Sequence, residues 1–261
     1  MKIKVVLDAL EQFAPLPLQE SWDNAGLQVG LTETEASGAL LCLDVNEKIV
    51  DEAIEKGCNI IVSHHPLLFR GVKQVSDSTY VQRIVMKAIK NDITIISMHT
   101  NMDNARNGVN FKIAEKLGMH SVRFLGSTTN EEKESGSGVI GELPEELDAA
   151  AFISKVKETF ECDCVMSNEL LQRPIRTIAI CGGAGAFILD DAIKEHADAF
   201  ITGEMHYHEY FDHEQEIQIA VLGHYESEHF TIEIFRDIIH GACPSLRIGI
   251  AETNTNPILY N

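Results

Sequence analysis

The chain has 261 residues, enough for one large domain or two smaller ones. A hydrophobic fraction of 44% and a charged fraction of 23% are ordinary for a globular protein, which excludes a disordered, fibrous or low-complexity chain. The sequence has 40 acidic and 21 basic side chains, a formal net charge of −19. This charge argues against nucleic acid and anionic membranes as partners, because both are bound by surplus Lys and Arg. Cations suit the chain better.

The cysteines and the N-terminal segment indicate a cellular compartment. The six cysteines form no C-x-x-C pair, and most lie in apolar runs. They predict reduced core thiols rather than a zinc ribbon or a disulfide framework. Asp8 and Glu11 interrupt the N-terminal apolar stretch, which argues against a secretory signal, and no segment has the roughly 20 apolar residues of a membrane span. We therefore expect a soluble, cytoplasmic protein.

In the first part of the chain, short apolar runs alternate with helical stretches. The runs predict strands within residues 38–45, 59–66 and 93–100, and the stretches predict helices within 50–57 and 80–90. This alternation predicts an α/β fold with a mostly parallel sheet covered by helices on both faces.

The middle of the chain, residues 126–173, is expected to be a connecting segment. A polar, Gly/Ser-rich loop is predicted at residues 127–138. A small β-α-β piece is predicted to follow, from 138–143, 147–160 and 162–167.

From about residue 174 the opening scheme returns, with strands expected within 177–183, 198–204, 217–224 and 247–252. One constant shift lays Asp51 on Asp190 and Val62 on Ile201 without a gap. We infer an internal duplication, with two α/β halves at residues 1–125 and 174–261 whose strand ends could share one crevice. The alternative is that any two strand-helix-strand units look alike.

Three strand ends carry residues that can bind metal. His64 and His65 end the second predicted strand, and His99 and Asp103 follow the third. Since adjacent residues on a strand point to opposite faces, two His ligands here require the chain to leave the strand. The alternatives are a buried and an exposed His for the pair, and a helix cap for Asp103. His99 is interpreted as a group that orients a ligand or polarises a substrate.

The third strand end opens a helix that is expected to continue through residues 230–239. On it His224 and Glu228 stand at i and i+4, so both side chains project from one face. A surface His–Glu pair is the alternative. The donors proposed from the three strand ends are His64, His65, Asp103, His224 and Glu228. Five imidazole and carboxylate ligands suit two divalent ions per chain, and without thiolate the set indicates zinc, manganese, iron or magnesium.

Further segments are expected near the same crevice. The turn containing Gly182, Gly183 and Gly185 could hold an anion such as phosphate, or could be a plain tight turn. Glu204 and His208 follow another strand and are candidates for general acid–base work. The single Trp of the chain, Trp22, lies in a Gly-punctuated loop in which Asp23 and Asn24 could line the rim of the site.

Together the stretches SWDNAGLQVG, SHHPLLF, HTNMDNARNGVN, CGGAG, ITGEMHYHEYF and GHYESE resemble the Nif-three-like family, whose members are often named GTP cyclohydrolase 1 type 2 homologues. The resemblance implies two interlocked α/β domains, a toroidal homohexamer and a dinuclear metal site facing the ring interior. It places the ligands on the five residues named above, with Glu228 bridging the two ions.

The chain resembles the short form of the family, because residues 126–173 are too few for the extra middle domain of longer members. It departs from the pattern T-G-D-x-K-Y-H by having Glu204 and His206 where many relatives have Asp and Lys.

The leading hypothesis is a metal-dependent hydrolase, similar to a GTP cyclohydrolase, that acts on a nucleotide-like substrate. On this hypothesis His99 or His208 handles protons, and the glycine turn lies near phosphates. One alternative is a metal-dependent phosphoesterase. The other is a non-enzymatic, hexameric metal-binding regulatory or scaffold protein.

Overall fold

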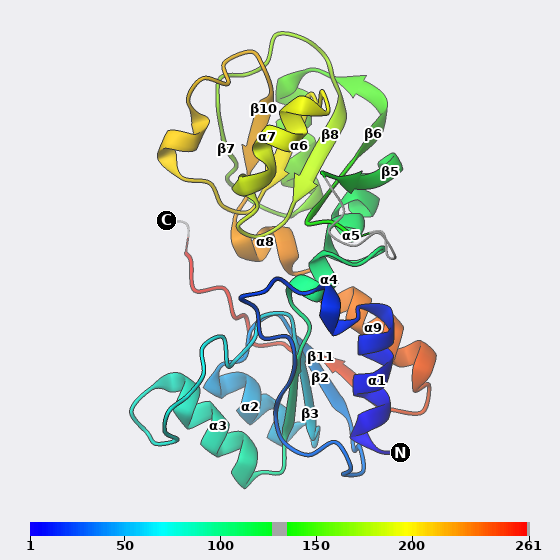
Figure 1. Cartoon of the computed structure of the whole chain (residues 1–261), viewed down its shortest axis with the longest axis vertical. Coiled ribbons are helices and arrows are strands. Elements are labelled where there is room, and N and C mark those ends of the chain that lie inside the picture. Colours follow the sequence, from blue (N-terminus) through cyan, green and yellow to red (C-terminus); the bar gives the residue numbers. More distant parts are fainter. Residues whose placement is uncertain (127–134, 260–261) are drawn as a thin grey trace. The chain divides into compact units, whose positions relative to one another are not determined.

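The structure is a computed structural model that describes residues 1–126 and 135–259 (Figure 1). The chain forms two compact units. Unit 1 comprises Met1–Met102 and Thr231–Asn261, and unit 2 comprises Asp103–Phe230. Most of the polar loop expected at 127–138 lies outside the described residues.

Unit 1 contains a five-stranded sheet with the strand order β1-β4-β3-β2-β11. Its strands are β1 (Gly26–Val29), β2 (Ala39–Cys42), β3 (Ile60–Ser63), β4 (Thr94–Ser97) and β11 (Ile248–Ile250). Neighbouring strands from β4 to β11 pair in parallel, and β1 pairs antiparallel with β4 at the edge. The central strands β2, β3 and β4 are buried throughout, which explains their continuous apolar runs.

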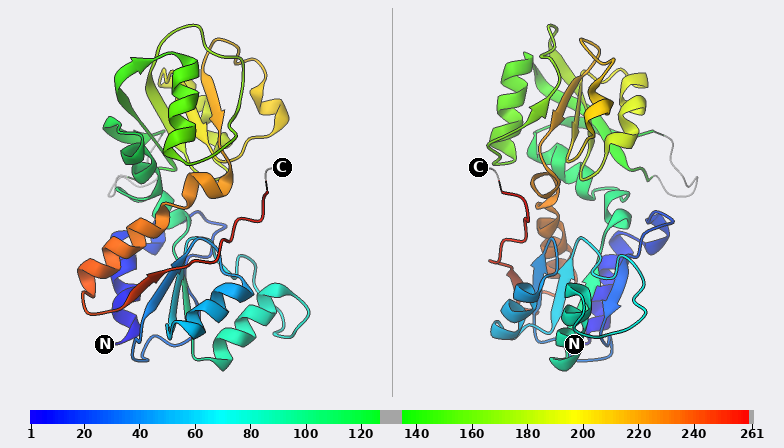
Figure 2. Two further views of the ribbon diagram at one scale, coloured as in Figure 1. Left: turned by 180° about the vertical axis from the view of Figure 1, so that it is seen from behind. Right: turned by 90° about the vertical axis from the view of Figure 1, so that its left-hand side faces the viewer.

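Helices cover both faces of this sheet (Figures 1 and 2). They are α1 (Ile3–Phe13), α2 (Glu47–Glu55), α3 (Tyr80–Lys90) and α9 (Thr231–Ala242), with a short 3-10 turn η1 (Leu16–Leu18). On the α2 and α3 side, Ile49 and Ile84 pack on strand residues that include Ile61. Side-chain caps start both helices, because Asn46 and Thr79 accept hydrogen bonds from Ile49 N and Gln82 N.

Unit 2 contains a six-stranded sheet with the order β5-β6-β8-β9-β10-β7. The strands are β5 (His120–Leu125), β6 (Gly138–Leu147), β7 (Met166–Ser167), β8 (Ile175–Cys181), β9 (Ala199–Thr202) and β10 (Gln218–Val221). Strands β8, β9 and β10 are parallel, whereas β5, β6 and β7 pair antiparallel with their neighbours. This second sheet is therefore mixed.

The helical segments of unit 2 are short apart from two. They are α5 (Val109–Lys116), α6 (Ala149–Thr159), α7 (Leu189–Lys194) and α8 (His224–Glu228), with η2 (Ala186–Ile188) and η3 (Tyr207–Tyr210). Helices α6 and α7 lie on opposite faces of the sheet (Figure 2). Helix α4 (Thr100–Asp103) contains the first boundary between the units along the chain, which falls between Met102 and Asp103.

The α/β class and the expected order of strands and helices are confirmed, but the domain boundaries differ from those expected at residues 125 and 174. The C-terminal strand β11 pairs with β2, which assigns residues 231–261 to unit 1. The segment 126–173 is not merely a connection, because β6 forms ladders with both β5 and β8. Both units contain three consecutive parallel strands, and a duplication as their origin stays a prediction.

The helix expected to run on from His224 is also interrupted. Helix α8 ends at Glu228 and α9 begins at Thr231. The hydroxyl of Ser227 donates to the carbonyl of His224 at 2.8 Å, a local bond of the kind that competes with helical hydrogen bonding.

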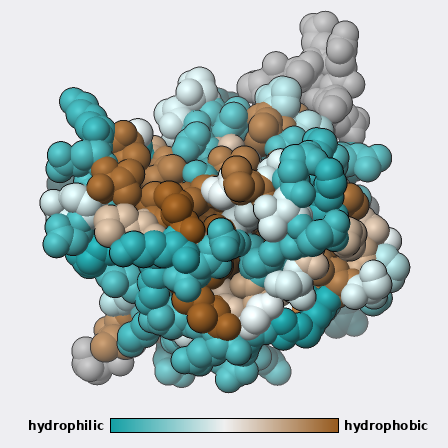
Figure 3. All heavy atoms as spheres, turned by 90° about the horizontal axis from the view of Figure 1, so that it is seen from below, coloured by the Kyte–Doolittle hydropathy of each residue, from teal (hydrophilic) through white to brown (hydrophobic). Residues whose placement is uncertain are grey.

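Among the described residues, no helix combines the length and the apolar character needed to cross a bilayer. Figure 3 shows one face of the molecule, on which hydrophilic side chains cover most of the surface and apolar side chains form several smaller groups.

Unit 1 depends on the C-terminal helix, in which Phe235 is fully buried. We expect Phe235→Ala to lower the free energy of unfolding by about 3–5 kcal/mol, because it leaves a cavity between α9 and its neighbours. Urea titration measures the change. Ile89→Ala, at an exposed position of α3, is the control and should stay within about 0.5 kcal/mol of the wild type. Equal effects of the two substitutions would contradict this packing.

Candidate metal centre

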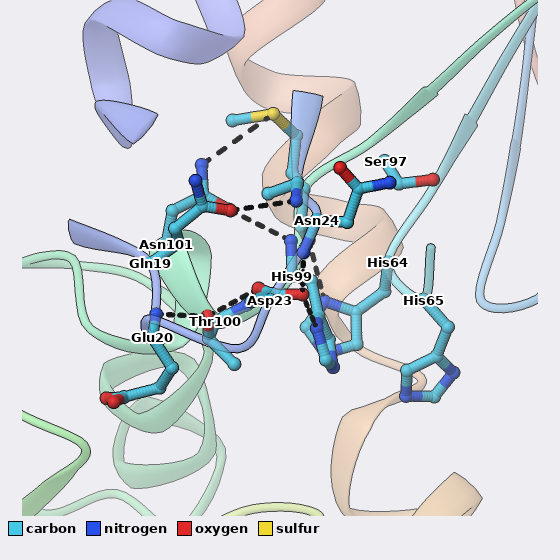
Figure 4. A network of polar contacts seen from close by, with 12 residues as sticks. Gln19, Glu20, Asp23, Asn24, His64, His65, Ser97, His99, Thr100 and Asn101 are labelled. Atoms are coloured by element: carbon cyan, nitrogen blue, oxygen red, sulfur yellow. Dashed lines mark hydrogen bonds and ion pairs between the residues drawn. The ribbon is translucent and has the colours of Figure 1, made fainter. Parts of the chain in front are cut away.

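Three histidines of unit 1 lie together at the carboxyl ends of β3 and β4 (Figure 4). The ring centroid of His99 is 5.3 Å from that of His64 and 5.5 Å from that of His65, and the last two are 4.9 Å apart. Each offers one ring nitrogen, and these three atoms lie within 4.8 Å of one another. Three converging imidazole nitrogens can hold a divalent transition metal.

The chain leaves the strand at His64, as two ligands from adjacent residues require. Strand β3 ends at Ser63, and the backbone N–H groups of His64 and His65 both donate to the carbonyl of Leu43, at 3.1 and 3.0 Å. The hydroxyl of Ser63 donates to the carbonyl of His65 at 3.0 Å. This tight turn ends the alternation of the strand, so both rings reach one cluster.

The Nδ1 atom of each histidine is engaged by an oxygen acceptor. Nδ1 of His64 is 2.8 Å from the carbonyl of Met98, and Nδ1 of His65 is 2.7 Å from Oδ1 of Asp44. Nδ1 of His99 is 2.7 Å from Oδ1 of Asp23. Because carbonyl and carboxylate oxygens only accept hydrogen bonds, Nδ1 carries the hydrogen in these pairs. Each Nε2 thereby keeps its lone pair in the neutral ring, which is the tautomer that binds metal.

Asp23 is the more shielded of the two carboxylates, with a side chain that is 0% exposed. Besides His99, it accepts from the backbone N–H of Thr100 at 3.0 Å and from the Thr100 hydroxyl (Figure 4). Burial raises the pKa of Asp23, but the hydrogen bonds from His99 and Thr100 outweigh burial and lower it to about 2. Asp23 is therefore a fixed negative charge beneath the His99 ring.

Asp44 supports His65 in a more open setting. Its second oxygen accepts from the hydroxyl of Thr255 at 3.2 Å. Burial raises the pKa of Asp44, but the hydrogen bonds from His65 and Thr255 and the charge of His65 together outweigh burial and lower it below its usual value. Asp44 stays ionised at neutral pH and keeps the imidazole of His65 oriented.

Unit 2 contains a second set of donors on the short helix α8. Nε2 of His224 lies 3.1 Å from Oε2 of the buried Glu228, one helical turn away, which confirms that the two side chains share a face. On the other side of the ring, Nδ1 of His224 lies 2.9 Å from Oε1 of Glu204. Glu204, expected to act in acid–base chemistry, thus orients a histidine as Asp23 and Asp44 do in unit 1.

The glycine turn between β8 and η2 does not form the expected anion cradle. Its N–H groups already donate within unit 2, Gly182 to Asn110 Oδ1 at 2.9 Å, Gly183 to Ser227 Oγ at 2.9 Å, and Gly185 to Thr202 Oγ1 at 3.1 Å. An anion would have to displace these side chains. The expectation that this turn binds phosphate is corrected on that ground.

Gly183 instead makes room for Glu228. It has a φ of +60°, and a Cβ at this position would lie 2.2 Å from Oε1 of Glu228. The carbonyl of Gly183 also accepts from the N–H groups of Gly203 and Glu204, both at 2.9 Å. Gly183 therefore has two roles: its carbonyl holds the backbone at Gly203 and Glu204, and its missing side chain leaves room for the carboxylate of Glu228.

The other expected site residues lie as follows. Asp103 is half-buried at the end of α4 and belongs to unit 2. Asp103 and Glu228 both lie near enough to Cys181 for their charges to raise the pKa of its thiol, which burial already raises. His208 is exposed, and its ring lies among the rings of Tyr207 and Phe211, with centroids 5.2 and 5.9 Å away.

Sequence reasoning missed Asp44 as a functional residue. Its signal was its position two residues after the end of β2, at the same edge of the sheet as His64 and His99. Asp23 was expected only at the rim of the site. Each of these carboxylates accepts a hydrogen bond from an imidazole, Asp44 from His65 and Asp23 from His99. Both pairs join residues that are far apart in the sequence.

The Asp23 network gives a prediction for stability. We expect Asp23→Asn to lower the free energy of unfolding at pH 7 by about 1–3 kcal/mol, because a buried charged acceptor of several hydrogen bonds is lost. With a folded pKa of about 2 and an unfolded pKa near 3.9, the charge of Asp23 stabilises the fold fully above about pH 4, and this contribution is lost as the pH falls toward 2. Urea titrations between pH 7 and pH 2.5 measure this. Asp8 forms an exposed ion pair with Lys4, and Asp8→Asn is the control, which should leave the free energy of unfolding close to that of the wild type. An Asp23→Asn effect that does not change with pH would contradict the network.

A second prediction concerns Gly183. Both Gly183→Ala and Gly118→Ala place a Cβ at positive φ, +60° and +73°, which costs about 1–2 kcal/mol. Gly118 has no atom within 4 Å of the added Cβ, whereas the Cβ at position 183 meets Glu228. We therefore expect Gly183→Ala to be the more destabilising and to displace the carboxylate of Glu228, which thermal unfolding and a crystal structure of the variant would show. Equal losses would mean that only backbone strain matters.

Comparisons with known proteins agree with this architecture. The family model of Duf34/NIF3 (NGG1p interacting factor 3) matches residues 1–257. A GTP cyclohydrolase 1 type 2 homolog of Clostridium acetobutylicum is 31% identical over 100% of this chain and 99% of its own length. A homolog of the same name from Clostridium perfringens is 35% identical over 87% of each chain.

Solved structures resemble the whole chain as well. The crystal structure of Staphylococcus aureus protein SA1388 has a TM-score of 0.90 at 26% identity, covering 100% of this chain and 99% of that one. A Bacillus cereus protein related to NIF3 has the same fold, with a TM-score of 0.89 at 22% identity and the same coverage. By sequence and by fold, this chain belongs to the Duf34/NIF3 family.

Proposed function

We propose that this protein binds divalent metal and acts as a metal-dependent hydrolase on a nucleotide-like substrate. The observation that carries the proposal is the cluster of His64, His65 and His99, in which an oxygen acceptor faces each Nδ1, so that Nε2 of His64 and of His65 can bind metal beside the ring of His99. The name of its relatives, GTP cyclohydrolase 1 type 2 homolog, supports the choice of substrate class.

We further propose two ions per chain, held by His64, His65, Asp103, His224 and Glu228. A mixture of imidazole and carboxylate ligands without thiolate suits zinc, manganese, iron or magnesium. When bound, such a pair supplies a water that ionises near neutral pH and Lewis-acid polarisation of the substrate. The pairing of Glu228 with His224 supports the assignment, because a buried carboxylate beside an imidazole is a ready-made pair of donors.

The residues of the chain have separate parts in this proposal. His99 is the favoured proton-transfer group, because the hydrogen bond from its Nδ1 to Asp23 fixes its ring beside His64. His208 is less favoured, since its ring contacts are with exposed aromatic side chains. Glu204 orients His224, as Asp44 orients His65.

We also propose that the chain assembles into a toroidal homohexamer, as its family resemblance implies. Light scattering on metal-loaded and chelated protein measures this. A ring that needs its metal but catalyses nothing would favour the non-enzymatic scaffold, and turnover of generic phosphoesters but not of GTP would favour a phosphoesterase.

Metal content tests the proposal directly. We expect wild-type protein to bind about two divalent ions per chain, and His65→Ala and Glu228→Gln each to weaken binding about 10–100-fold or more, because each removes a donor from a converging set. His240→Ala, an exposed histidine at the end of α9, is the matched control and should leave metal content unchanged. Elemental analysis and competition with a chelator measure these values.

Activity is tested on the same variants. GTP hydrolysis by protein loaded with manganese or zinc should fall at least about 100-fold in Glu228→Gln and remain in His240→Ala, since a stabilisation of several kcal/mol is lost. Unchanged metal content in both His65→Ala and Glu228→Gln would refute the metal site. Full metal content without turnover would refute the hydrolase alone.

A further inference from the structure

Two large aromatic side chains of unit 1 are exposed next to the histidine cluster. Trp22 is 58% exposed and Phe69 is 49% exposed. Both lie outside the regular strands and helices, on the segments that precede β1 and follow β3. Large aromatic groups normally contribute most when buried, and a surface loop that leaves two of them in water is typical of a binding site.

The two aromatic rings lie against each other and against His99. Their centroids are 5.7 Å apart with an interplanar angle of 49°. The centroid of His99 is 6.0 Å from that of Trp22 and 6.2 Å from that of Phe69. A ligand ring stacked on Trp22 or Phe69 would therefore lie in the neighbourhood of His99, whose own ring is 5.3 Å from that of His64.

Hydrogen bonds tie the two loops together. Nδ2 of Asn24 donates to the carbonyl of Leu68 at 2.8 Å, and the N–H of Leu68 donates to Oε1 of Gln28 at 3.1 Å. Nε2 of Gln28 in turn donates to the carbonyl of Asn24 at 2.7 Å. Since these bonds hold the neighbours of Trp22 and Phe69, a ligand that uses both rings meets a preformed surface and loses less free energy to ordering.

We propose that Trp22 and Phe69 form a binding subsite for a planar aromatic ring of the substrate, a heteroaromatic base in particular, and hold it beside His99. Aromatic faces bind such rings by stacking, and the contact tolerates different bases because every base has a π-face. The proposal deepens the proposed function by naming the side chains that hold the base of the substrate, and it rests on that function only for the reaction that follows binding.

The charge of the chain favours this occupant over a membrane. Exposed Trp and Phe can also anchor a protein at a bilayer surface, but such surfaces are anionic and attract basic segments. The net charge here is −19, and the closest charged neighbour of Trp22 along the chain is the carboxylate of Asp23.

The single Trp of the chain makes the test direct, because all indole fluorescence comes from Trp22. Chelated and metal-loaded protein are titrated with guanosine 5′-monophosphate and, as a matched probe without a base, with ribose 5-phosphate. We expect the first probe to change Trp22 emission saturably in both forms of the protein and the second to leave it unchanged. Saturable binding of both probes with equal affinity would overturn the proposal, and so would no response to either.

Variants locate the subsite. Phe69→Leu should weaken binding of guanosine 5′-monophosphate about tenfold, the typical loss for one stacking partner. Phe187→Leu removes an aromatic ring that is 69% exposed in unit 2 and should bind as the wild type does. Trp22→Leu has no indole, so its affinity for guanosine 5′-monophosphate is measured by calorimetry. We expect this substitution to weaken binding at least as much as Phe69→Leu does. Wild-type affinity in both Phe69→Leu and Trp22→Leu would overturn the proposal.

The same samples separate this proposal from the proposed function. Metal content per chain is measured for Phe69→Leu and should equal that of the wild type, since Phe69 is not among the proposed ligands. Base binding by a wild-type protein that takes up no metal when zinc or manganese is supplied would refute the metal-dependent function and leave the subsite standing. Full metal content without base binding would do the reverse.

Discussion

The candidate centre depends on one interaction, the hydrogen bond at Nδ1 of each clustered histidine. The three ring centroids lie about 5 Å apart, so the direction in which each ring nitrogen points decides whether the rings can share a cation. A carbonyl next to Nδ1 of His64 and carboxylates next to Nδ1 of His65 and His99 hold each ring in one orientation. In the neutral ring this arrangement leaves the lone pair on Nε2, the atom that binds a cation.

Unit 2 also has a histidine whose Nδ1 lies beside a carboxylate, but there the histidine is on a short helix. Glu204 holds His224 from one side while Glu228 faces it from the other. A buried carboxylate needs space and partners, and the space comes from a glycine whose missing side chain lets the backbone approach Glu228. The turn between β8 and η2 is therefore structural support for an acid rather than a site for an anion.

Much of the fold could be predicted from the sequence, because fully buried parallel strands must be continuously apolar and their helices must show one apolar face. Residues such as Ile61 and Ile95 carried that signal. The edge of the sheet at which His64 and His99 lie followed from the rule that strand ends in one parallel sheet share a side.

The rest depends on contacts that leave no local pattern. A three-residue strand such as β11 carries too little information to show that it pairs with β2, some 200 residues earlier. The support that Asp44 gives to His65 and the use of the glycine amides by Asn110, Ser227 and Thr202 likewise depend on long-range placement. Single-residue chemistry could nominate the histidines, but it could not say what holds them.

The discontinuity of unit 1 has a consequence for biosynthesis. Residues 231–261, which supply α9 and β11, are synthesised after unit 2, which is continuous in the chain. Until residues 231–261 are made, β2 has an unpaired edge and helix α1 lacks α9. The nascent chain thus carries its histidine-bearing sheet in an incomplete form while unit 2 is being made.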